Sequence, residues 1–136
     1  GKPHGMSYDP TTATFSYDSW RTASNWAVDY SWWHKDPEEV VLSDRIQKFL
    51  FSQRIGTFSD RYTLDGKPLS ERHSPGMMAT TATAGLAATK GFISKAFVEQ
   101  LWNAPIPSGE QRYYDGMLYM MSLLHSSGNF RIWAPK

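Results

Sequence analysis

The sequence predicts an all-α fold of about five helices that follow one another as antiparallel hairpins. Apolar residues recur at helical spacing in five segments, and proline and glycine interrupt the chain between them. Little of the chain alternates with the two-residue period of a strand. Consecutive helical hairpins build bundles, α-solenoids or toroidal α/α barrels. Several helices carry more apolar surface than a chain of 136 residues easily covers, so we expect part of a larger assembly.

The first two predicted helices meet at a proline. Residues 1–15 are expected to be irregular, because glycine and proline interrupt any period. A helix is expected over residues 16–35, followed directly by a second helix that ends near Gln53. Asp36 is the expected N-cap of that second helix, and Pro37 its first helical residue.

A long loop is expected next, over residues 54–75. Loops of this length in a compact domain are usually functional or disordered. Residues 77–89 are rich in Ala, Thr and Met, a composition typical of a closely packed, buried helix. An amphipathic helix is expected over residues 92–103, where two nearby prolines end it.

The last predicted helix begins at a capping box formed by Ser108 and Gln111 and ends at Gly128. Residues 130–133 are expected to be a short extended piece. Five methionines are expected to fill the core: Met77, Met78, Met117, Met120 and Met121.

Composition excludes several classes of function. The formal net charge is +1, so no strong field recruits nucleic acid or an anionic membrane surface. No apolar stretch approaches the ~20 residues of a membrane-spanning helix. The chain has no cysteine, no phosphate-binding glycine loop and no histidine pair at metal-ligand spacing, so we expect no cofactor and no metal site. Six Trp, seven Tyr and seven Phe fit either a carbohydrate-binding groove or a core of large rings.

The candidate site lies where the first helix is expected to begin. Asp18 follows Tyr17 and precedes Arg21 by three residues, with tryptophans on either side. Flat rings can stack on sugar faces while a carboxylate activates water or protonates a glycosidic oxygen, which makes Asp18 the candidate catalytic residue. The alternative is structural: Asp18 caps the helix and the tryptophans fill the core.

Several separated blocks, in order, resemble glycoside hydrolase family 8, and in particular its reducing-end xylose-releasing exo-oligoxylanases. The blocks are Tyr17-Asp18-Ser19-Trp20-Arg21 with Asn25, Asp29 and Trp32-Trp33, then Thr63-Leu64-Asp65-Gly66, Glu71-Arg72-His73-Ser74-Pro75-Gly76, and Tyr113-Tyr114-Asp115-Gly116 through Phe130-Arg131-Ile132. The resemblance implies an (α/α)6 barrel and an inverting mechanism, with residues 1–136 as its C-terminal segment.

The resemblance also implies roles for individual residues. Asp18 falls on the family's general base, Arg21 on its conserved arginine, and Tyr17 beside the water. The loop that contains Arg72 and His73 resembles the element that closes the cleft in the exo-acting enzymes. Deletion of residues 72–74 is therefore expected to let longer chains pass. The last helix offers two more substrate-binding candidates, Tyr113 and Tyr114. The alternative to that role is one buried and one exposed ring in the packing of the helix.

The chain departs from the family in extent. The family's general acid is a glutamate in the N-terminal part of the barrel, and no segment here matches it. A complementing N-terminal polypeptide is therefore expected to supply the general acid for the cleavage of xylo-oligosaccharides. Two alternatives remain: an endo-acting cellulase, chitosanase or xylanase of the same family, and a non-catalytic helical fragment or scaffold. The sequence fits a cytoplasmic enzyme and an exported one equally.

Overall fold

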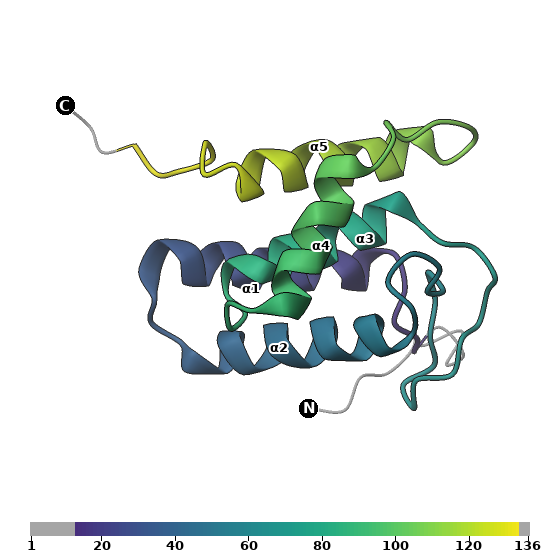
Figure 1. Cartoon of the computed structure of the whole chain (residues 1–136), viewed down its shortest axis with the longest axis horizontal. Helices are drawn as coiled ribbons and strands as arrows, with labels where there is room; N and C mark the ends of the chain where they lie inside the picture. The colour runs from purple at the N-terminus through teal and green to yellow at the C-terminus, as the bar shows by residue number, and fades with distance from the viewer. Residues whose placement is uncertain (1–12, 134–136) are drawn as a thin grey trace.

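The computed structural model describes residues 13–133, and this part of the chain is all-helical, as predicted (Figure 1). Two isolated β-bridges, which join Tyr62 to Phe15 and to Pro68, are the extended pairings within it. The helices are α1 (Asp18–Trp33), α2 (Pro37–Ser52), α3 (Pro75–Thr83), α4 (Phe92–Asn103) and α5 (Arg112–Ser126), with a 3₁₀ turn at Ala84–Leu86 after α3.

The junction between α1 and α2 forms as predicted. His34 takes a left-handed conformation with φ of 50°, which ends α1. The Asp36 carboxylate accepts a hydrogen bond of 2.9 Å from the Glu38 N–H, and Pro37 is the first helical residue. The N-cap prediction for α2 is therefore confirmed.

Helix α3 is shorter than the predicted 77–89 and begins two residues earlier. Ser74 caps it, with the Met77 N–H donating to the Ser74 hydroxyl over 3.1 Å. Its threonine hydroxyls bond back to carbonyls one turn earlier, and the carbonyl of Thr81 accepts 2.9 Å from the buried Gln47 side chain. Such side-chain bonds compete with the helical pattern, and the chain tightens into a 3₁₀ turn after Thr83.

The predicted capping box of α5 is wrong. Helix α5 begins at Arg112, and its N-cap Gln111 makes no side-chain capping bond. Gly109 lies between the two predicted partners with a φ of +81°. This left-handed residue turns the chain, so a helix cannot begin directly after Ser108.

Helix α3 forms the centre of the molecule, and every residue from Gly76 to Thr83 is buried. In Figure 1, α1, α3 and α5 run in the same direction, and their N-terminal ends lie at the end of the molecule that also carries the 53–74 connection. The core packs α1, α2, α3 and α4 against that connection through large buried side chains: Trp20, Leu50, Phe58, Tyr62, Met77, Phe97 and Leu101. Three helix N-termini and one long loop thus share one end of the fold.

The methionines of α5 contradict the prediction that all five fill the core. Met77 and Met78 are buried, whereas Met117 is 46% exposed and Met120 is 51% exposed.

Two glycines offer a test of the α3–α5 packing. A Cβ at Gly76 would lie 2.7 Å from Asp115 Oδ1 and 3.0 Å from Leu118 Cδ1, so Gly76→Ala is expected to destabilise the fold by ~1–3 kcal/mol through overpacking. Gly116, in α5, has no atom within 4 Å of the added Cβ. Gly116→Ala is therefore expected to stabilise by about 0.5–1 kcal/mol. Urea unfolding measures both, and equal effects would contradict the close approach at Gly76.

Candidate active site

Four of the sequence-predicted residues meet at the shared end of the fold. Asp18 is the first residue of α1, and Tyr17 is its N-cap. Arg21 Nη2 lies 2.7 Å from Asp18 Oδ1. Tyr114, in the first turn of α5, directs its hydroxyl to the same Asp18 oxygen over 3.4 Å. The fold therefore joins a carboxylate, a guanidinium and a phenol from two helices that are far apart in the sequence.

The alternative in which Asp18 caps α1 is wrong. The N-cap position belongs to Tyr17, and no side chain caps this helix. Ser19 serves the preceding turn instead, because its hydroxyl accepts 2.7 Å from the Ser16 N–H and donates 2.9 Å to the Ser16 carbonyl. The Asp18 side chain is 79% exposed, and its Oδ2 has no hydrogen-bond partner among residues 13–133. That oxygen is open to a water molecule.

Tyr17 holds an unusual backbone conformation beside the carboxylate. Its φ of 45° and ψ of −104° lie outside the regions that side-chain-bearing residues prefer. Its ring packs against Trp20, with centroids 5.3 Å apart, and against the edge of Tyr114 at 6.3 Å. The Arg61 guanidinium lies 6.0 Å from the ring centre. A residue held this way costs about 1–3 kcal/mol, and such strain gathers at functional sites.

The electrostatics of the cluster favour a protonated phenol at Tyr114. Asp18 lies at the positive N-terminal end of α1 and pairs with Arg21. Burial, and secondly the negative charge of Asp18, raise the pKa of the Tyr114 phenol. Tyr114 therefore remains a hydrogen-bond donor at neutral pH, and its half-buried ring rests on Trp20 at 5.9 Å.

Arg72 lies in a buried ionic network that the sequence did not reveal. Its guanidinium bonds Asp60 Oδ2 at 2.6 Å and also Asp115 Oδ2. Both carboxylates are buried, and Asp115 accepts a further bond of 2.7 Å from the Ser74 hydroxyl. One arginine thus ties the 53–74 connection to the N-terminal ends of α3 and α5. Its guanidinium is occupied by protein, in contrast with the substrate contact expected for Arg72.

The other two predicted residues lie apart from the Asp18 carboxylate. His73 Nδ1 is 2.9 Å from the Phe58 carbonyl, and its ring meets the Phe58 ring edge-on at 4.5 Å. Tyr113 is 80% exposed, while its neighbour Tyr114 is half-buried. The two rings therefore differ in exposure, and neither is fully buried.

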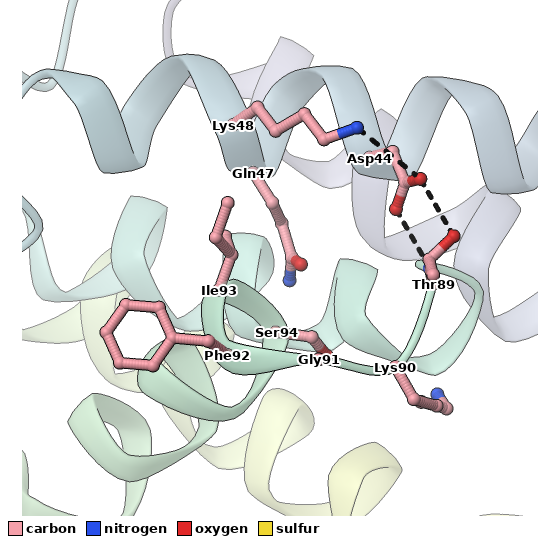
Figure 2. A pocket seen from close by; sticks show the side chains of 9 residues that line it. All are labelled: Asp44, Gln47, Lys48, Thr89, Lys90, Gly91, Phe92, Ile93 and Ser94. Atoms are coloured by element: carbon pink, nitrogen blue, oxygen red, sulfur yellow. Dashed lines mark hydrogen bonds and ion pairs between the residues drawn. The ribbon is translucent and has the colours of Figure 1, made fainter.

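A separate hollow of about 200 Å³ lies between α2 and the start of α4 (Figure 2). Asp44 on α2 accepts bonds from the Thr89 N–H at 2.8 Å and the Thr89 hydroxyl at 2.9 Å, while Lys48 approaches the same carboxylate at 3.8 Å. The Asp44 carboxylate is thus occupied in holding the turn before α4. We therefore assign it a structural role.

Burial of His125 on α5 predicts a pH-dependent stability. Neither ring nitrogen has a hydrogen-bond partner in the described part of the chain, and burial lowers the pKa of His125. The unfolded chain therefore binds more protons than the folded one as the pH falls through about 6.5. The free energy of unfolding is therefore expected to decrease as the pH is lowered through this window. The decrease should be smaller in the His125→Leu variant. Chemical denaturation at several pH values measures this dependence, and His34→Asn, at an exposed position, is the control. If the stability of the His125 variant depends on pH as strongly as that of the wild type, the prediction is contradicted.

Within residues 13–133, no three His, Asp or Glu side chains are grouped so that they could hold a metal ion. In the same residues, no helix has both the length and the apolar character needed to cross a membrane.

The chain is similar to part of several glycan-degrading enzymes, although no protein-family model matches it. Reducing-end xylose-releasing exo-oligoxylanase Rex8A of Paenibacillus barcinonensis is 39% identical over 142 residues, which cover 96% of this chain and 37% of the relative. Endoglucanase 2 of Ruminiclostridium josui is 29% identical over 126 residues, covering 93% of this chain and 26% of the relative. A family 8 glycoside hydrolase of Teredinibacter turnerae, solved as a xylobiose complex, superposes with a TM-score of 0.92 at 42% identity, over 99% of this chain and 34% of that one.

The chain spans between 26% and 37% of the length of these relatives and matches their C-terminal part. The relatives are glycoside hydrolases. The solved structures on which this chain superposes have the (α/α)6 barrel fold. The five helices described here therefore form part of such a barrel.

Proposed function

We propose that this chain, a homologue of the C-terminal part of family 8 glycoside hydrolases, supplies the general base for hydrolysis of β-1,4-xylo-oligosaccharides with inversion. One observation carries the proposal: an exposed carboxylate lies among aromatic rings, at the residue that the resemblance assigns to the family's base, and its Oδ2 has no hydrogen-bond partner among residues 13–133. Homology to exo-oligoxylanases and family 8 xylanases supports xylo-oligosaccharides as the substrate class.

Asp18 would act on a water molecule through Oδ2. Its Oδ1 is held by Arg21 and approached by the Tyr114 hydroxyl, so the carboxylate is oriented while Oδ2 can accept a proton. The water then attacks the anomeric carbon on the face opposite the leaving oxygen. An inverting pair of carboxyl groups is separated by roughly 6.5–9.5 Å to admit this water.

A segment outside this chain would supply the general acid. Two of the described carboxylates near this end, Asp60 and Asp115, are buried and bound to Arg72, which makes them unsuited to protonating a leaving oxygen. Glu71 and Glu110 are exposed at the same end, but neither lies in a sequence context that resembles that of the family's acid. The relatives extend well beyond the matched third. The 136 residues would therefore work as the C-terminal segment of a barrel whose N-terminal part carries the acid.

Release of single xylose units depends in this proposal on the 53–74 connection. His73 lies at its end, close to the capped start of α3, and could meet a reducing-end hydroxyl through Nε2 because Nδ1 is bound to the Phe58 carbonyl. Arg72 would support this loop through Asp60 and Asp115 without contacting the sugar.

An endo-acting xylanase is the second candidate. A Teredinibacter turnerae xylanase of the same family, solved as a catalytic mutant in complex with xylohexaose, is 41% identical to this chain. Occupation of the Arg72 guanidinium by two carboxylates also favours an open cleft, since it removes one group from the expected barrier.

The test uses a fused polypeptide, in which the N-terminal part of the Teredinibacter turnerae enzyme is joined to this chain where the match begins. Hydrolysis of reducing-end-labelled xylohexaose should release labelled xylose alone if the chain forms an exo-acting site. Labelled xylobiose and xylotriose from the first turnovers would establish the endo-acting alternative. Absence of any hydrolysis by a folded fusion would contradict the proposed function.

A further inference from the structure

Asp115 is a buried carboxylate that takes no part in the proposed mechanism. The residue is only 3% exposed and lies in the first turn of α5. Burial of an ionised carboxyl group is costly unless hydrogen bonds and an opposite charge compensate it. The contacts of Asp115 provide both kinds of compensation.

Both oxygens of the Asp115 carboxylate are bound at the N-terminal end of α3. Oδ1 accepts a hydrogen bond of 2.7 Å from the Ser74 hydroxyl, and Ser74 is also the N-cap of α3. Oδ2 is bound to the Arg72 guanidinium, which holds Asp60 as well. The positive end of the α3 dipole stabilises the same negative charge. The Asp115 side chain is therefore fixed in both position and direction.

A glycine in α3 allows this close approach. A Cβ at Gly76 would lie 2.7 Å from Asp115 Oδ1 and 3.2 Å from Asp115 Cα, so a larger residue would displace the carboxylate. The first turn of α5 therefore lies directly against the backbone of α3.

Tyr114 immediately precedes Asp115 and points toward the candidate base. Successive residues of an α-helix are turned by about 100° about its axis, so these two side chains face different neighbours. The Tyr114 hydroxyl lies 3.4 Å from Asp18 Oδ1, and the Tyr114 ring centre lies 5.9 Å from that of Trp20. Hydrogen bonds of catalytic groups are often long in the absence of substrate. The direction of the Tyr114 hydroxyl thus depends on how firmly the first turn of α5 is held.

From these contacts we infer that Asp115 is a positioning residue for the proposed reaction, and that it holds the Tyr114 hydroxyl against the Asp18 carboxylate. Its own carboxylate is bound by protein, so it acts through Tyr114 and not on the sugar. The inference rests on the proposed function, because it takes Asp18 as the base. Ser74 and Arg72, which anchor Asp115, both belong to the 53–74 connection, so the same contacts couple that connection to the base.

A double-mutant cycle on the fused polypeptide tests this inference. Tyr114→Phe removes the hydroxyl, and Asp115→Asn replaces the carboxylate by a neutral amide that binds Arg72 more weakly. Each change should lower kcat for xylotriose by ~2–10-fold, the effect of one hydrogen bond, and leave KM nearly unchanged. The double variant should be no slower than Tyr114→Phe alone, because both changes remove the same contact. Gly116→Ala, at the next position of α5, is the control and should keep the wild-type kcat.

NMR of the 136-residue chain measures the position of Tyr114 without any activity. Nuclear Overhauser effects between the Tyr114 and Trp20 rings are expected in the wild type and should weaken in Asp115→Asn. They should persist in Gly116→Ala. Unchanged effects in a folded Asp115→Asn chain would overturn the inference.

The cycle has equally definite outcomes. Decreases in kcat that multiply in the double variant would overturn the inference, as would an unchanged kcat in a folded Asp115→Asn fusion. If Asp115→Asn does not fold, Arg72→Lys takes its place in the cycle, since a lysine ammonium lacks the planar fork that binds both carboxylates. Weakened ring contacts in the variant, with no hydrolysis by the wild-type fusion, would support the anchoring of Tyr114 and count against the proposed function.

Discussion

Replacement of Asp18 by asparagine is expected to slow hydrolysis by the fused polypeptide by roughly 10²–10⁴-fold, the usual cost of losing a general base. The asparagine keeps the shape of the side chain and can still accept from Arg21, but it cannot take a proton from water. The rate of xylose release from xylotriose measures the effect. The Tm should change little, because a surface substitution away from buried contacts usually shifts stability by less than ~0.5 kcal/mol.

Asp29→Asn is the matched control for this prediction. It removes an exposed carboxylate from the same helix, three turns away from the candidate site. Its rate should stay close to that of the wild type. A rate in the Asp18 variant that equals the rate of this control would remove Asp18 from the catalytic role, while the fold assignment would stand.

The helical fold could be predicted from sequence because its signals are local. Asp36 and Pro37 mark a helix start through their own chemistry, and this prediction is confirmed. The C-terminal end of α3 and the start of α5 could not be predicted in the same way, because they depend on backbone conformation and on contacts with other segments. Gln47 reaches the Thr81 carbonyl across 34 positions in the sequence, and Gly109 turns the chain inside an apparent capping box.

The candidate site likewise combines a local feature that the sequence reveals with contacts between distant segments that it does not reveal. A sequence pattern drew attention to Asp18 and Arg21, which are one helical turn apart. The pattern could not show that Tyr114 approaches Asp18 or that Arg72 turns toward Asp60 and Asp115, because these contacts arise from packing between distant segments. The resemblance of its loop to the cleft-closing element of the exo-acting enzymes favours a substrate role for Arg72, whereas its contacts favour a structural one.

Arg72→Met is expected to cost about 3 kcal/mol of stability. Removing one partner of a buried ion pair typically costs 3–5 kcal/mol, because a charge remains without compensation. Here two buried carboxylates, Asp60 and Asp115, would lose the same guanidinium. The lower end of the range applies because the Arg72 side chain is 34% exposed, so solvent screens part of the interaction. Urea unfolding of the 136-residue chain measures the loss.

Two further variants separate the ionic network from the methylene packing of Arg72. Arg45→Met, at an exposed position of α2 with no salt bridge in the described structure, should have little effect. Adding Asp60→Asn and Asp115→Asn to Arg72→Met should recover part of the lost stability, because it removes the uncompensated charge. If Arg72→Met instead leaves unfolding unchanged but alters the products formed from xylohexaose by the fused polypeptide, then the guanidinium serves the substrate.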